Sequence, residues 1–344
     1  MRTSAWPVES EQSEDPELEE VAPAIVSLHF LRRALRRRWR VWAGCALVGV
    51  LLGAAAYLMW GAFPLYFPLL EPAGSLEMLG HRVVWSAVTM VVVVLALSQL
   101  AALRALLADP RRTRLLLAAA VTITVNWGVY IYGVTHDRVV ETALGYYINP
   151  LVTVLMGVLL LGERMRRLQV VALGVAAVAV AVLTVGYGRP PWVAMALALS
   201  FGTYGLLKKT ANAGAVPSLT LETLFIAPVA LAYLAFLGSS GAAEFGDNGL
   251  VHALLLTTTG VVTAVPLLCF GAAATRIPLT TIGLLQYLTP TLQFLLGVLY
   301  FREDMPAARW IGFVLVWVAL VIFTFEALRH RRRQLRLTVA AAVG

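Results

Sequence analysis

Long apolar stretches with few polar interruptions recur along the chain from about residue 41 to residue 328. A transmembrane helix needs about 20 such residues, and the core helices of soluble proteins do not need this length. The pattern therefore predicts an all-α polytopic membrane protein. Ten transmembrane helices are expected, roughly over residues 43–66, 76–100, 114–135, 139–161, 168–186, 191–209, 217–238, 250–274, 278–301 and 306–328.

One polar interruption of this pattern occurs twice, which predicts an internal repeat. Tyr147-Ile148-Asn149-Pro150 in the fourth span returns as Tyr287-Leu288-Thr289-Pro290 in the ninth. At the same offset, Gly157 returns as Gly297 and Glu163 as Glu303. Each half then holds five spans, and an odd number makes the second copy enter the membrane upside down. Two inverted five-helix repeats of this kind are typical of secondary transporters, whose substrate sites lie between the repeats.

The domain organisation follows from the spans and their flanks. Residues 1–40 form a separate tail that is acidic at first and ends in the basic run LRRALRRRWR. The first repeat is expected over residues 43–186 and the second over residues 191–328. Residues 329–344 make a basic tail at the other end.

Charge refines the picture without changing it. The 344 residues are 60% hydrophobic and only 13% charged, about half the charged fraction of a soluble domain. The net charge of +8 reflects cations beside the spans, so the sequence gives no reason to expect nucleic acid as a partner. With ten spans, most Lys and Arg fall on one side, which predicts that both termini are cytoplasmic. The opposite side holds only Arg82, Arg138, Arg189, Arg302 and Arg309.

Several segments carry a resemblance to a known family. They are MWGAFPLYFPLL, LEMLGHRVVWS, NWGVYIYGVTHDRVVETALGYYINPLV, SFGTYGLLKK, LTLETL and IGLLQYLTPTLQFLLGVLYF. The chain resembles the RarD-type permeases, called chloramphenicol-sensitive proteins, of the EamA branch of drug/metabolite transporters, over about residues 45–326. The resemblance implies a carrier of the bacterial inner membrane with two EamA repeats and points to efflux. One departure is that the turn Leu161-Gly162-Glu163 reads Phe301-Arg302-Glu303 in the second copy.

Polar side chains within the spans are the candidate site residues, because lipid solvates them poorly. Several recur four residues apart and so share one helix face, as Asn126 and Tyr130 do. Such faces fit the walls of a shared cavity for a small-molecule substrate. Aromatic side chains would hold its apolar part, amides would orient its polar groups, and Arg82 would pair with an anionic group. The predicted substrate-binding residues are Arg82, Asn126, Trp127, Tyr130, Tyr146, Tyr147, Asn149 and Gln286.

Three glutamates are candidates for coupling transport to protons. Glu141 is preferred because it lies on the polar face of the fourth span, while Glu77 and Glu222 are rivals nearer the outer and inner surfaces. A carboxyl group in a poorly solvated cavity binds a proton more readily than in water. Glu141 is also close to the end of its helix, so the alternative that it is simply a solvated end residue stays open. Pro150 and Pro290 are expected to be structural kinks.

Other functional classes find little support. The sequence has no G-x-S-x-G, H-E-x-x-H or Walker A motif, and its five histidines are scattered. Cys45 and Cys269 make neither a disulfide framework nor a metal cluster. No enzyme activity, metal or cofactor is therefore predicted. The preferred function is an alternating-access exporter of a small amphipathic metabolite or drug-like solute. A channel or uniporter for a small solute is the alternative, and an intramembrane enzyme is less favoured. The oligomeric state stays open, with a homodimer as one possibility.

Overall fold

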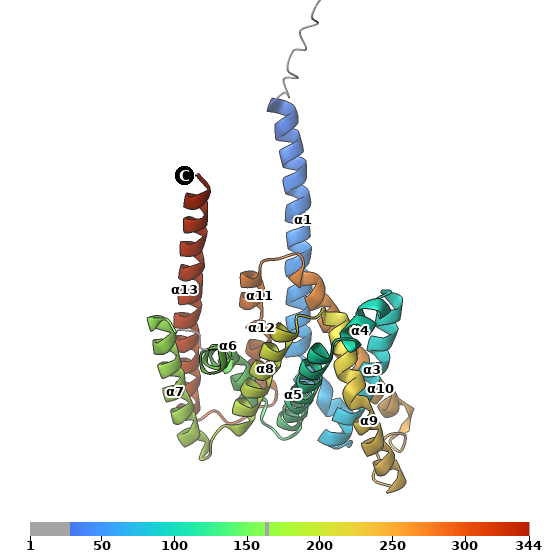
Figure 1. Ribbon diagram of the computed structural model, residues 1–344. Coiled ribbons are helices and arrows are strands. Elements are labelled where there is room, and N and C mark those ends of the chain that lie inside the picture. Colours follow the sequence, from blue (N-terminus) through green and yellow to red (C-terminus); the bar gives the residue numbers. More distant parts are fainter. Residues whose placement is uncertain (1–27, 162–164, 344) are drawn as a thin grey trace, which may run out of the picture. The chain divides into compact units, whose positions relative to one another are not determined.

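The computed structural model describes residues 28–161 and 165–343, all of whose regular elements are helical (Figure 1). Glu163, one of the repeated residues, lies outside the described residues. Residues 46–344 form one compact unit. The helices are α1 (Leu28–Gly61), α2 (Phe63–Tyr66), the 3-10 helix η1 (Phe67–Leu70), α3 (Ser75–Ala96), α4 (Leu100–Leu107), α5 (Pro110–Thr135), α6 (Val139–Leu161), α7 (Arg167–Tyr187), α8 (Trp192–Ala211), α9 (Ala215–Ser239), α10 (Gly249–Ala274), α11 (Leu279–Leu285), α12 (Leu288–Leu295), the π-helix η2 (Leu296–Tyr300) and α13 (Ala307–Val343).

Nine helical segments of the described chain are long and apolar enough to cross a membrane. They correspond to nine of the ten spans expected from the sequence. The remaining one, α8, is a helix of 20 residues that ends in Lys208 and Lys209, and these two cations lower its hydropathy. It packs against α5 and α6. The chain is an all-helical, multi-pass membrane protein.

Helix boundaries follow local chemistry. Asp109 precedes α5 and accepts the N–H groups of Arg111 and Arg112 at 3.0 and 3.1 Å, while Pro110 occupies the first helical position. This combination is a strong helix start, because the first N–H groups of a helix lack intrahelical acceptors. At the other end of a helix, Gly188 terminates α7 with φ +66°, a conformation that glycine adopts without strain.

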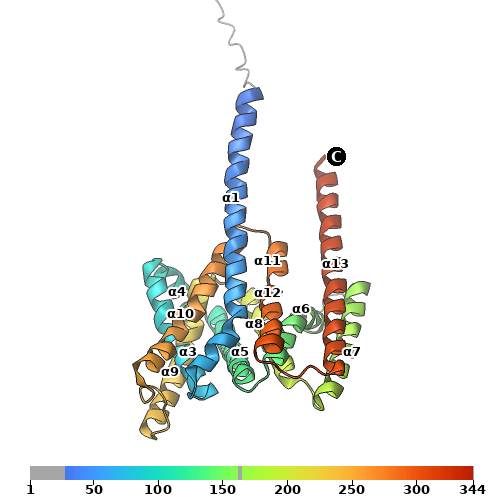
Figure 2. The same ribbon diagram turned by 180° about the vertical axis from the view of Figure 1, so that it is seen from behind.

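Close helix pairs rest on small residues. α13 packs on α7, and α3 packs on both α9 and α10, as Figures 1 and 2 show from opposite sides. A Cβ atom on Gly260 of α10 would lie only 2.2 Å from the carbonyl oxygen of Trp85 on α3. A Cβ on Gly145 of α6 would lie 2.9 Å from the carbonyl oxygen of Ala194 on α8. Glycine at both positions lets the backbones approach, as is common between membrane helices.

The two copies of the repeated motif differ in structure. Pro150 lies inside the continuous helix α6, whereas the expected span over 278–301 is interrupted between α11 and α12, at Gln286 and Tyr287. Pro290 explains the interruption, because it has no N–H to donate to the carbonyl of Gln286, four residues earlier, and its ring crowds that carbonyl. The two copies lie in contact: α6 packs on α12, and the hydroxyls of Tyr147 and Thr291 are 2.9 Å apart.

Candidate functional site

An arginine surrounded by aromatic rings is the clearest candidate for a ligand contact. The guanidinium of Arg82, on α3, lies 4.4 Å from the ring centre of Trp127 and 5.3 and 5.6 Å from those of Phe63 and Phe67. Its Nε donates a hydrogen bond to Thr263 Oγ1 at 3.1 Å. The residue is 4% exposed, and its Nη1 has no hydrogen-bond partner among the residues that the structure describes.

The charge of Arg82 is not balanced by an acid. Among the residues that the structure describes, no Asp or Glu lies within ion-pair distance of it. Cation–π contacts contribute about 2 kcal/mol or more in desolvated sites. An unpaired charge buried in a protein costs several kcal/mol. An anionic or strongly polar ligand group at Nη1 would offset this cost, which makes the position suitable for binding.

The aromatic wall continues from Arg82 toward the second half of the chain. The ring centres of Phe67 and Tyr130 are 6.0 Å apart, and those of Tyr130 and Tyr146 are 5.8 Å apart. Gln293, on α12, donates from Nε2 to the Tyr130 hydroxyl at 3.0 Å and to the Trp60 carbonyl at 3.3 Å. Its Oε1 is buried and unpartnered. We call Arg82, Phe67, Trp127, Tyr130 and Tyr146 the aromatic site.

Of the eight substrate-binding residues predicted from the sequence, four lie in the aromatic site. The other four lie elsewhere. Asn126 donates to the Leu197 carbonyl and to Ser200 Oγ at 3.1 and 3.0 Å, so it joins α5 to α8. Tyr147 faces Thr291 and Trp317. Asn149 is half-buried with an unpartnered Oδ1, and Gln286 is half-buried at the interruption between α11 and α12.

Two of the three candidate coupling glutamates hold backbone segments in place. Glu77 accepts the N–H groups of Glu244 and Phe245, in the α9–α10 connection, at 2.9 and 3.2 Å. Glu141 receives two hydrogen bonds from Arg189, at 2.7 and 3.3 Å, and the N–H of Val193 at 3.0 Å. The hydrogen bond to Glu141 raises the pKa of the Arg189 guanidinium above its ordinary value. Both carboxylates thus resemble helix and loop caps.

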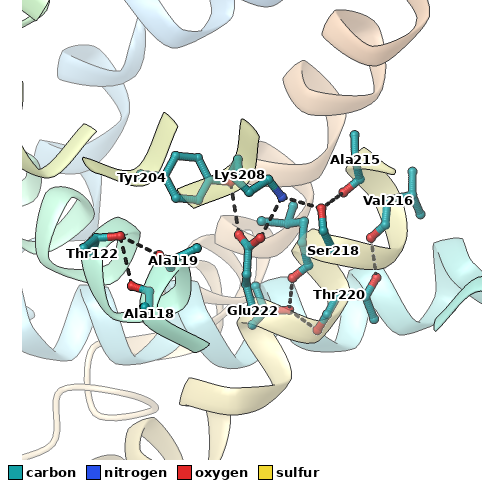
Figure 3. Close-up of polar contacts among 12 residues, drawn as sticks. Ala118, Ala119, Thr122, Tyr204, Lys208, Ala215, Val216, Ser218, Thr220 and Glu222 are labelled. Carbon is teal, nitrogen blue, oxygen red and sulfur yellow. Dashed lines mark hydrogen bonds and ion pairs between the residues drawn. The ribbon is translucent and has the colours of Figure 1, made fainter. Parts of the chain in front are cut away.

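The third candidate, Glu222 on α9, has a different environment (Figure 3). Its two oxygens accept from Lys208 Nζ at 2.6 Å and from the Tyr204 hydroxyl at 3.1 Å, and both donors belong to α8. Lys208 also donates to Ser218 Oγ. Glu222 is 1% exposed. We call Tyr204, Lys208, Ser218 and Glu222 the α8–α9 cluster.

Tyr204 and Lys208 were not among the sequence candidates. A usable signal was present. Tyr204 and Lys208 are four residues apart, as are Ser218 and Glu222, so each pair occupies one helix face. What the spacing did not reveal is that these two faces meet.

Glu303 caps a helix, but not the one that follows it in the sequence. It accepts the N–H groups of Val139 and Val140 at the start of α6, in the other half of the chain. Burial raises the pKa of this carboxyl from 4.5 to about 7 despite the two backbone donors. In the described part of the chain, no group of three His, Cys, Asp or Glu side chains could hold a metal ion.

Comparison with known proteins identifies the family. The model of the EamA-like transporter family matches residues 47–185 and again residues 190–325. The chain belongs to the EamA-like transporter family. EamA proteins are membrane transporters and not enzymes, and the two matches show that the EamA domain occurs in two halves here.

Relatives of this EamA protein are bacterial. Protein RarD of Streptomyces exfoliatus is 54% identical over 86% of this chain and 93% of its own length. Protein RarD of Escherichia coli K12 is 42% identical over 83% of this chain and 96% of its own. The chloramphenicol-sensitive protein RarD of Pseudomonas aeruginosa is 32% identical over 84% and 97%. A solved crystal structure at 18% identity covers 81% of this chain and 98% of its own, with a TM-score of 0.55, which shows a similar fold.

The aromatic site and the α8–α9 cluster belong to different EamA halves, and one residue of each lines the same narrow crevice. Arg82 and Trp127 lie in the first half, and Tyr204, Lys208 and Glu222 in the second. A narrow crevice has Trp127 and Glu222 in its wall. Its other lining residues are Val83, Ile123, Thr124, Leu219, Thr223 and Ile226.

Proposed function

We propose that this EamA transporter is a secondary carrier for a small amphipathic solute bearing an anionic group. The observation that carries the proposal is Arg82, a buried guanidinium without an acidic partner among the described residues. Ionisable groups within membrane spans are costly and are characteristically functional. Trp127 and Tyr146 offer flat apolar surfaces beside the charge, which suits an aromatic or otherwise apolar body.

The proposed architecture is ten spans, with α8 as the tenth, in two inverted five-helix repeats over residues 43–186 and 191–328. The contact between α6 and α12 supports it, because it brings together the two copies of the repeated motif. The distribution of Lys and Arg supports cytoplasmic termini. The tails over residues 1–40 and 329–344 are then cytoplasmic, in the inner membrane of a bacterial cell.

Alternating access is the proposed mechanism. The two repeats rock about a site near the membrane midplane and expose it to one side at a time. Gln293 joins the aromatic site from the second repeat through Tyr130. Asn149, with its free Oδ1, and Gln286, at the interrupted helix, remain proposed polar contacts for the solute. Export is the proposed direction because the resemblance to drug and metabolite permeases favours it.

The proposal is tested by a ligand-stabilisation screen on the purified protein, followed by uptake into proteoliposomes. The screen pairs aromatic carboxylates with their neutral amides, and chloramphenicol is added as a further neutral compound. A ligand that binds only the folded state raises the melting temperature. Carboxylates are expected to stabilise the protein where their amides do not. Arg82→Gln should weaken carboxylate binding about tenfold to a hundredfold, since a hydrogen bond to a charged group contributes about 1.5–3 kcal/mol.

The control is Arg112→Gln, because Arg112 is an exposed arginine at the start of α5. It should bind and transport as the unmodified protein does. Arg82→Lys keeps the charge and should retain part of the affinity. Equal stabilisation by amides and carboxylates, or carboxylate binding that is indifferent to Arg82→Gln, would refute the anionic substrate. Binding without transport would refute the carrier.

A further inference from the structure

The three candidate coupling glutamates are all buried, but only one has partners that can all move away. Glu77 and Glu141 each accept backbone N–H groups, from Glu244 and Phe245 and from Val193. Backbone donors at a loop or a helix start stay in place whatever the charge of the acceptor. Within the described residues, Glu222 is hydrogen-bonded by side chains alone, those of Tyr204 and Lys208.

We propose that Glu222 is the proton-binding group of the carrier, and that its protonation breaks the ion pair with Lys208, leaves Lys208 on Ser218 alone and thereby weakens the contact between α8 and α9. In this step the carboxylate takes up one proton and becomes a neutral carboxylic acid. The ammonium group of Lys208 keeps its own proton throughout. The charge of the α8–α9 cluster changes from neutral to +1, and the attraction between Glu222 and Lys208 disappears.

The geometry offers hydrogen-bond partners for Lys208 and Tyr204 in both the charged and the protonated state of Glu222. In the charged state, Lys208 Nζ contacts Glu222 and Ser218 together (Figure 3). In the protonated state, Ser218 Oγ remains as an acceptor for Lys208, while the new O–H of Glu222 can donate to the Tyr204 oxygen. The side chain of Lys208 is 21% exposed, compared with 1% for Glu222. The Lys208 side chain therefore extends from the buried carboxyl toward the surface. Water can solvate its ammonium group there once the ion pair with Glu222 is broken.

The surroundings of Glu222 contain few other titratable groups. From α8, Tyr204 and Lys208 face it, and they are the ionisable side chains that interact with it within the described residues. α3 contributes Val83, and α5 contributes Ile123, Thr124 and Trp127, to the crevice beside it. α4 also packs on α9, and its Arg104 makes no ion pair with Glu222. Among the described residues, Lys208 is thus the cation that pairs with Glu222.

Trp127 is the residue through which the proton site can act on the substrate site. It lines the crevice beside Glu222 and at the same time lies 4.4 Å from the Arg82 guanidinium. A movement of α9 on protonation would therefore reach the ring against which Arg82 rests. This coupling rests on the proposed function. The protonation of Glu222 itself does not, because it requires no substrate.

The experiment uses the proton as the probe. Infrared difference spectra of the reconstituted full-length protein, recorded while the pH is changed, report the absorption of buried carboxyl groups as they gain a proton. The unmodified protein should show a protonated-carboxyl band that is absent from Glu222→Gln. The same band should persist in Glu141→Gln, Glu77→Gln and Glu303→Gln, which serve as matched controls. Glu222→Asp should retain a band at an altered frequency, and it provides a second variant if Glu222→Gln does not fold.

A second measurement follows the weakening of the contact between α8 and α9. Hydrogen exchange over residues 204–218, corrected for the intrinsic pH dependence of exchange, should accelerate at least several-fold at acidic pH in the unmodified protein. It should stay unchanged with pH in Glu222→Gln. A band that survives in Glu222→Gln and vanishes in Glu141→Gln would overturn the proposal. If the band behaves as expected but no carboxylate is transported, the proton site stands and the proposed function fails.

Discussion

Glu141 and Glu222 form a natural pair for comparison. Each is 1% exposed, and each is paired with one cation, Arg189 at 2.7 Å or Lys208 at 2.6 Å. The difference lies in the remaining donors. Glu141 accepts the backbone N–H of Val193 near the start of α8, whereas the donors to Glu222 in the described part of the chain are all side chains. Equal burial and equal pairing therefore do not imply equal roles.

The comparison shows what distinguishes a structural carboxylate from a switchable one. A carboxylate near a helix N-terminus satisfies N–H groups that have no intrahelical acceptor, and it complements the positive end of the helix dipole. Protonating it costs hydrogen bonds that nothing else replaces. A carboxylate held by side chains has partners that can turn to other acceptors, as Lys208 can turn to Ser218.

The largest expected effect separates the two glutamates by stability. Glu141→Ala removes the partner of Arg189 and the acceptor of Val193, and should destabilise the fold by roughly 3–5 kcal/mol, as breaking buried pairs does. Arg189 is partly exposed, which favours the lower end of that range. Thermal unfolding in detergent measures the loss. Glu222→Gln should cost much less, because its amide can still hydrogen-bond to Tyr204. Similar losses for both variants would remove the distinction between them.

Glu303 tests whether a carboxylate held by the backbone can still titrate near neutral pH. Its pKa is raised from 4.5 to about 7 by burial, so the folded protein binds this proton more tightly than the unfolded chain does. Its contribution to stability is complete below pH 4.5 and is lost as the pH rises through about 7. The loss should approach about 3 kcal/mol. Unfolding midpoints measured from pH 4 to pH 8 should decline less steeply in Glu303→Gln. Parallel curves would contradict the assignment.

The smallest expected effect concerns Tyr204. Tyr204→Phe removes one hydrogen bond to Glu222 and leaves the ion pair with Lys208 in place. The expected destabilisation is about 1 kcal/mol, the usual net contribution of a single hydrogen bond. The carboxyl band of Glu222 should persist in this variant. Chemical unfolding gives the stability, with Tyr233→Phe, on a part-exposed tyrosine of α9, as the control. A loss as large as that of Glu141→Ala would show that Tyr204 supports the fold and not only the carboxylate.

The sequence was informative where chemistry is local. Apolar length and charge placement predicted the helical membrane fold, and the repeated Tyr-x-x-Pro motif predicted two related halves. The resemblance predicted the EamA family. The interruption at Gln286 and Tyr287 was not predicted, although Pro150 and Pro290 are equivalent in sequence. A proline in a helix can be accommodated or can end the helix, depending on which neighbours satisfy the freed carbonyl.

The contacts of the candidate site residues could not be predicted from the sequence, because identical local patterns lead to different partners. Asn126 and Tyr130 share one stripe of α5, yet Asn126 binds the backbone of α8 while Tyr130 joins the aromatic site. Glu303 lies close in the sequence to the start of α13, yet it caps α6, and Val139, which it contacts there, is 164 residues away in the chain. Spacing along one helix places a side chain on a face, but it does not determine which helix packs against that face.

The sequence by itself determined that this protein resides in a lipid bilayer, because the length of each hydrophobic segment can be read from that segment alone. It also determined the family, since motif identity does not depend on packing. Only the tertiary structure decided that Arg82 lacks an acidic partner among the described residues and that Glu222 meets Lys208. The net energy of a buried charge is set by the groups brought around it from other segments, and that arrangement exists only once the helices have packed.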